Sequence, residues 1–129
     1  MTQEEKDLLL KDLCARLFYG VKVEYENKTF DIEYVCPMYE EVKLDIPETW
    51  TIGISEVKPY LFPMSSMTEE QKEEFNTRSL ELQLKVINDE IMYEKATEFE
   101  VDFYNKHHLD WRGLIPKGLA LDATGLNIY

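Results

Sequence analysis

The sequence predicts one α+β domain, in which a helix precedes a strongly bent antiparallel sheet and further elements follow. Two observations predict this class: apolar residues recur at helical spacing near the amino terminus, and four runs of strictly alternating residues come next. The chain has 129 residues, of which 44% are hydrophobic, and this supplies one core. We therefore expect a single domain over residues 1–129.

The first element is an amphipathic helix of about sixteen residues. Thr2 and Glu5 have the spacing of a capping box, and Gly20 is placed to end the helix. Asp12 precedes Arg16 by four residues, so we expect this pair on the exposed side, like Asp7 with Lys11. The apolar stripe, which we expect to be buried, consists of Leu9, Leu10, Leu13, Cys14 and Leu17.

The next four runs alternate with period two and predict an antiparallel sheet with one solvated face. The runs are Val21–Tyr25, Phe30–Tyr34, Val42–Ile46 and Trp50–Ile54, separated by breaks that include Pro37 and Pro47. Tyr60 to Phe62 would add a closing strand. This element order resembles small barrels of the Sm or Src-homology type, so the alternatives are an open bent sheet and a closed barrel. Such a resemblance carries no function.

The run from Lys58 to Gln71 connects this sheet to the second half of the chain. Two prolines interrupt regular structure, while Tyr60, Leu61, Phe62 and Met64 supply apolar side chains for the core. The run ends in a capping box, either Thr68 with Gln71 or Ser66 with Glu69, which predicts a short helix to about Thr77. We expect this run to leave the sheet, fill the core and begin a helix.

Leu80, Leu82, Leu84 and Val86 alternate with polar residues and predict a strand. A long helix is the alternative, because Leu80, Leu84, Ile87 and Ile91 share one helical face. Asn88 and Asp89 predict a turn. Thr97 and Glu100 form another capping box, so we expect a helix from Thr97 that ends near His107, followed by an irregular but packed tail.

Charge and composition exclude several functions. The net charge of −12 argues against general nucleic-acid binding and against docking on anionic lipid. Half of the excess lies between residues 68 and 100. No apolar run approaches the ~20 residues of a membrane helix, and the amino terminus lacks a signal-peptide pattern. We expect a cytoplasmic protein with reduced Cys14 and Cys36, although a disulfide between them remains an alternative.

His107, His108 and Asp110 form the one cluster that suggests a metal site. Adjacent histidines diverge by about 100° on a helix, so a helix end with one packed and one solvated ring is the alternative. We predict no cofactor. Neither a nucleophile elbow nor a phosphate-binding glycine loop occurs, so no catalytic residue is predicted.

Four residues are candidates for binding. Trp111 beside Arg112 suggests a recognition site, although Arg112 could equally pair with Asp110 or cap the preceding helix. Tyr60 and Phe62 are candidates for lining a peptide groove, with packing in the core as the alternative.

Three segments also carry a resemblance: Leu8–Leu17 with Tyr19–Val23, Lys58–Gln71, and Asn105–Ala123. Together they resemble a group of small proteins, without assigned activity, that gut bacteria of the Bacteroides kind and their phages or integrated elements encode. The resemblance covers both ends and the middle of the chain. It implies a cytoplasmic accessory protein of a mobile element and assigns no catalytic residue.

Three functional hypotheses result from the sequence. The first is a non-enzymatic domain that binds a protein partner through an apolar or acidic surface. The second is a small metal-dependent hydrolase that uses His107, His108 and Asp110. The third is an acidic decoy that mimics nucleic acid, which requires the carboxylates between Glu69 and Glu100 to share one face.

Overall fold

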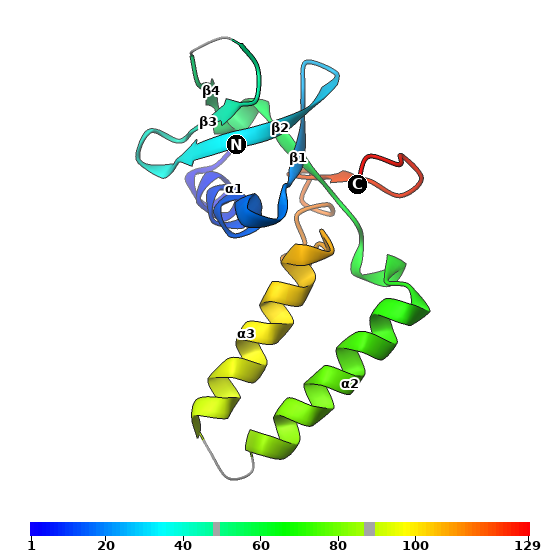
Figure 1. The fold of residues 1–129 in the computed structure, drawn as a ribbon. Coiled ribbons are helices and arrows are strands. Elements are labelled where there is room, and N and C mark those ends of the chain that lie inside the picture. The colour runs from blue at the N-terminus through cyan, green and yellow to red at the C-terminus, as the bar shows by residue number, and fades with distance from the viewer. Residues whose placement is uncertain (48–49, 87–89) are drawn as a thin grey trace.

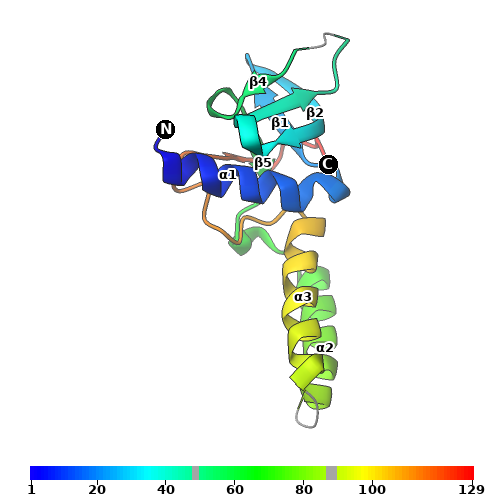
Figure 2. The ribbon, with the colours of Figure 1, turned by 90° about the vertical axis from the view of Figure 1, so that its left-hand side faces the viewer.

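The computed structural model describes the backbone of residues 1–47, 50–86 and 90–129, and within these the side chains outside 82–97. Helix α1 (Gln3–Arg16) and a six-stranded sheet form one part, which we call the body. Helices α2 (Glu69–Val86) and α3 (Glu90–Lys106) form a hairpin, the arm, that projects from the body (Figures 1 and 2). The class is α+β, as predicted.

Helix α1 begins at the predicted capping box. The Glu5 backbone N–H donates to Thr2 Oγ1 at 3.1 Å, and the Thr2 N–H donates to Glu5 Oε1 at 3.0 Å. A 3₁₀ turn, Leu17–Tyr19, extends the helix to Gly20, whose φ of 78° provides the left-handed cap. The prediction that Cys14 is buried is wrong: it is exposed, because it lies ~100° around the helix from fully buried Leu13.

All four alternating runs form strands, in the sheet order β4-β3-β2-β1-β5-β6. The neighbours are antiparallel except β5 and β6, which are parallel. Strands β4 and β6 are the two edges, so the sheet is open and the barrel alternative is wrong. Strand β6 in the tail was not predicted. The strands are β1 (Lys22–Tyr25), β2 (Lys28–Cys36), β3 (Glu41–Leu44), β4 (Ile52–Gly53), β5 (Lys58–Leu61) and β6 (Leu121–Asp122).

Aliphatic side chains from α1, the sheet and the tail make the core of the body. The β2–β3 register shifts between Ile32 and Tyr34, as at a β-bulge, which bends a strand. The residues with no exposed surface in this core are Leu9, Leu13, Val23, Val42, Leu44, Val57, Leu61 and Leu114.

The arm corrects two predictions. The strand predicted over Leu80–Val86 is wrong, because α2 remains helical to Val86. Its residues from Arg78 onward are mostly strong helix formers (Leu, Glu, Gln, Lys), and this propensity overrides the alternation. The helix start predicted at Thr97 is also wrong, since α3 already begins at Glu90. The turn predicted at residues 88–89 lies outside the described residues.

Hydrogen bonds stabilise the base of the arm, both in the segment that leads into α2 and in the segment that leaves α3. The Thr68–Gln71 capping box is formed as predicted, with bonds of 3.0 and 3.1 Å. Phe62 donates its N–H to the His108 carbonyl, and Asp110 donates to the Phe62 carbonyl, both at 2.8 Å. Farther along the arm, aromatic rings of the two helices pack together; they belong to Phe75, Phe99, Phe103 and Tyr104. Among the described residues, no helix is both long and apolar enough to cross a membrane.

Candidate functional site

The two histidines of the predicted metal cluster have separate packing partners. The His107 ring lies 4.5 Å from that of Phe103, and its Nδ1 lies 3.3 Å from Gln71 Nε2. The His108 ring stacks on Tyr129 at 3.6 Å, with 14° between the planes. Burial lowers the pKa of His107, and it lowers the pKa of His108 to about 4, so both rings are neutral at pH 7.

The third member of that cluster, Asp110, is engaged by the backbone. Its two carboxylate oxygens accept hydrogen bonds from the N–H groups of Leu114 at 2.7 Å and Ile115 at 2.9 Å. Among the side chains that the structure describes (1–47, 50–81 and 98–129), no group of three or more His, Cys, Asp or Glu is placed to hold a metal ion. The structure therefore does not bring His107, His108 and Asp110 together as ligands.

Trp111 and Arg112, two of the binding candidates, do lie together. The Arg112 guanidinium carbon is 4.2 Å from the centre of the Trp111 ring, a cation–π contact. The indole N–H donates to Asn105 Oδ1 at 3.0 Å, which fixes the ring. The acidic partner of Arg112 is Asp12, and not Asp110 as in one of the alternatives: Arg112 Nε lies 3.2 Å from Asp12 Oδ1.

Asp12 and Arg16 form an ion pair with both side chains fully buried, and the prediction that they are exposed is wrong. Arg16 Nε donates to Asp12 Oδ2 at 2.8 Å, and Arg16 Nη2 donates to the Leu109 carbonyl at 2.6 Å. Burial raises the pKa of Asp12, against the effect of the guanidinium. The i, i+4 spacing indicated the pair, but not the tail that covers it.

Tyr60 and Phe62 pack against the tail. Val23 pairs with Pro59, so Lys22 and Tyr60 face each other in the same register. The Tyr129 hydroxyl bridges them, accepting from the Lys22 N–H at 2.9 Å and donating to the Tyr60 carbonyl at 2.7 Å. Burial raises the pKa of this hydroxyl to about 12. Phe62 lines a cavity of about 200 Å³ at the base of the arm, together with His107.

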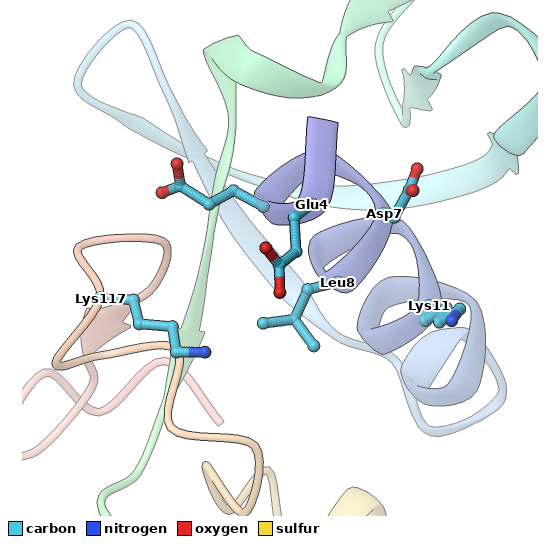
Figure 3. A pocket seen from close by; sticks show the side chains of 6 residues that line it. Glu4, Asp7, Leu8, Lys11 and Lys117 are labelled. Atoms are coloured by element: carbon cyan, nitrogen blue, oxygen red, sulfur yellow. The ribbon is translucent and has the colours of Figure 1, made fainter. Parts of the chain in front are cut away.

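Two hollows lie along the outer surface of α1. The first has a volume of about 790 Å³ and is lined by charged groups of both signs around Leu8. Figure 3 shows Lys117, from the tail, extending toward Glu4 and Leu8 of α1. Three acidic and two basic side chains line this hollow, so their charges nearly cancel and give little preference for a charged ligand. Its lining residues are Glu4, Glu5, Asp7, Leu8, Lys11 and Lys117.

The second hollow, which we call the Cys14 hollow, has a volume of about 640 Å³. It lies between α1 and the 3₁₀ turn Pro37–Tyr39 that connects β2 to β3. Partial burial raises the pKa of the Cys14 thiol, which disfavours a nucleophilic role. Both cysteines are unpaired, as expected. The lining residues are Asp7, Leu10, Lys11, Cys14, Ala15, Pro37 and Arg112.

Three large, exposed apolar side chains lie close in sequence to residues that line the Cys14 hollow. Phe18, one helical turn beyond Cys14, is 90% exposed. Met38 and Tyr39, directly after Pro37, are 85% and 71% exposed. We call the hollow together with these three residues the α1 patch. Sequence reasoning missed it, and the signal that could have found it is the apolar Pro37–Tyr39 turn between two strands.

The acidic residues of the arm share a face in part. Glu70, Glu73, Glu74 and Glu81 line one shallow hollow on α2. Arg78 lies in the same hollow, where its Nη1 is 3.1 Å from Glu81 Oε2. The side chains of Asp89, Glu90 and Glu94 lie outside the described residues. Comparison with protein-family models, with curated proteins and with solved structures finds no match to this chain.

Proposed function

We propose that the chain is a non-enzymatic protein-binding module that contacts its partner through the α1 patch. One observation carries the proposal: Phe18, Met38 and Tyr39 are the most exposed of the large apolar side chains described, and in the chain they lie close to Cys14 and Pro37, which line a hollow. Grouped exposed apolar residues beside a hollow are typical of interaction surfaces. The resemblance noted for the sequence adds the proposed context, an accessory protein of a phage or mobile element acting in the cytoplasm.

The surroundings of Phe18 and those of the predicted metal cluster both favour this choice. Phe18 makes an edge contact with Tyr19 at 5.1 Å, yet its own ring remains in solvent, where it adds nothing to the core. The hydrolase hypothesis loses its support, because His107, His108 and Asp110 each engage a different group.

Photocrosslinking from Cys14 tests the proposal, because this exposed thiol lies inside the hollow. Cys36→Ser leaves Cys14 as the single thiol for a benzophenone maleimide. After the purified, labelled chain is irradiated in a lysate of the native cells, we expect a discrete adduct with one partner protein. The adduct should disappear in Phe18→Glu/Met38→Glu and persist in Leu126→Glu, which changes another half-exposed apolar residue.

The absence of an adduct, or an adduct equally strong in the double variant, contradicts the proposal. Circular dichroism of each variant verifies folding, since all three changed side chains are at least half exposed.

The acidic decoy is a second candidate, favoured by the shared face of Glu70, Glu73, Glu74 and Glu81. Salt dependence separates the two candidates. Partner binding through carboxylates weakens steeply as salt increases, whereas binding through an apolar surface is much less sensitive. Measurement of partner affinity at two salt concentrations therefore decides which surface dominates.

A further inference from the structure

Arg112 lies at the edge of the Cys14 hollow, where two contacts restrict its orientation. One face of its guanidinium lies over Trp111 at 4.2 Å, and its Nε lies 3.2 Å from Asp12 Oδ1. Trp111 is itself fixed by Asn105. A guanidinium held in this way loses little conformational entropy when it binds a carboxylate.

The two terminal nitrogens of Arg112 remain available. In the part of the chain that the structure describes, neither Nη atom donates a hydrogen bond, and the side chain is 21% exposed. The nearby carboxylates face other groups: Asp12 Oδ2 accepts from Arg16 and its Oδ1 faces Arg112 Nε, while Asp110 accepts from two backbone N–H groups. The paired N–H groups of a guanidinium fork match the geometry of a carboxylate.

The hollow combines this guanidinium with apolar walls. Leu10, Ala15 and Pro37 line it, and Lys11 adds a second, exposed cation. Asp7 also lines the hollow, where it accepts a hydrogen bond from Gln3 at 2.9 Å, toward the start of α1. An incoming carboxylate is therefore repelled from the Asp7 end and attracted to Arg112 and Lys11.

We propose that the Cys14 hollow receives an acidic side chain, Asp or Glu, from an apolar segment of the partner protein. The carboxylate binds the Arg112 Nη edge and Lys11, while neighbouring apolar side chains of the segment contact Leu10, Ala15 and Pro37. Phe18 follows Cys14 by one helical turn and Met38 follows Pro37 directly, so each adds an exposed apolar side chain next in the chain to a lining residue, which favours a protein segment over a small molecule. This inference rests on the proposed protein-binding function and specifies the chemistry of the partner.

Selection of displayed random peptides on the full chain tests the inference. We expect the selected peptides to be enriched in one acidic residue flanked by apolar residues. A synthetic peptide of the enriched sequence should bind the chain. Replacing its acidic residue by Asn or Gln should weaken binding at least tenfold, which corresponds to about 1.4 kcal/mol of binding free energy.

Three protein variants give the matched comparison. Arg112→Gln keeps a planar group beside Trp111 and removes the charge, so the affinity for the selected peptide should fall about tenfold. Lys11→Met should lower it about threefold. Lys117→Met, the same charge change in the neighbouring hollow, should leave it unchanged. If Arg112→Gln unfolds, Lys11→Met decides, because Lys11 is exposed and outside the core.

The outcomes separate the inference from the proposed function. Apolar peptides without acidic enrichment overturn the inference and leave protein binding intact. Acidic peptides that bind Lys11→Met and Arg112→Gln as tightly as the unmodified chain also overturn it. Failure to select any peptide, together with no adduct from Cys14, overturns both.

Discussion

The body and the arm are stabilised in different ways. In the body, the Asp12–Arg16 ion pair joins α1 to the carbonyl of Leu109, 93 positions along the chain from Arg16. In the arm, aromatic rings of two helices that follow each other in sequence pack near the base. Besides its aliphatic core, the body therefore has a buried polar contact between distant parts of the chain. The arm depends on contacts between two consecutive helices, which can open without disrupting the body.

Removing the buried carboxylate should give the largest effect. In Asp12→Ala the Arg16 guanidinium stays buried without its anion, and we expect the free energy of unfolding to fall by about 3–5 kcal/mol. Chemical denaturation followed by circular dichroism measures this loss.

The double variant Asp12→Leu/Arg16→Met is the control for this comparison. It replaces both charges by apolar groups and should recover most of the stability that Asp12→Ala loses. A double variant as unstable as the single one would mean that the pair acts through shape and not through charge.

A change in the arm should have a smaller and local effect. The Phe75 ring contacts those of Phe99, Phe103 and Tyr104 at 5.2 to 5.9 Å. Since Phe75 is half-buried, Phe75→Ala should cost about 2 kcal/mol of local stability. Hydrogen exchange should show faster exchange in α2 and α3, with protection unchanged in β1 and β5. Equal loss in both regions would show that the arm and the body unfold as one unit.

Acidification should destabilise the body modestly through His108. Its pKa in the folded chain is about 4, below the usual 6.5, so only the unfolded chain takes up this proton between these values. The stability is complete above about pH 6.5 and is lost as the pH falls toward 4. His107 acts in the same direction, while Asp12, whose pKa is raised, opposes the loss at the acid end.

Because His108 is partly solvated, we expect Tm to fall by only about 3 °C between pH 7 and pH 5. His108→Asn, which tolerates the φ of 58° at this position, should reduce that fall. An identical pH dependence in this variant would assign the effect to another group.

The fold of the body was largely predictable from the sequence, and that of the arm was not. Alternation over Val21–Ile54 predicts strands because the side chains of a half-buried strand must alternate. From Leu80 to Val86 the same alternation occurs, but most of these residues have high helix propensity, and a helix forms. The short strand β6 gave no sequence signal, since it is a pairing of two residues with β5.

The candidate site was predictable only in part. The sequence indicated Trp111 and Arg112 as a recognition pair, and they lie in contact. It did not indicate that Phe18 is exposed, because an apolar residue that follows a helical stripe normally packs into the core. Whether such a residue meets the core depends on the angle at which the 3₁₀ turn leaves α1, which tertiary packing decides.

The hydrogen bonds that join Phe62 to His108 and Asp110 bring together the two points where the chain enters and leaves the arm. The arm is therefore an insertion: without it, the path of the chain through the body would be nearly continuous. Loop-closure entropy changes little with length, so lengthening or shortening such an insertion costs little. In evolution, the reach of the arm can vary while the sheet and the α1 patch keep their geometry.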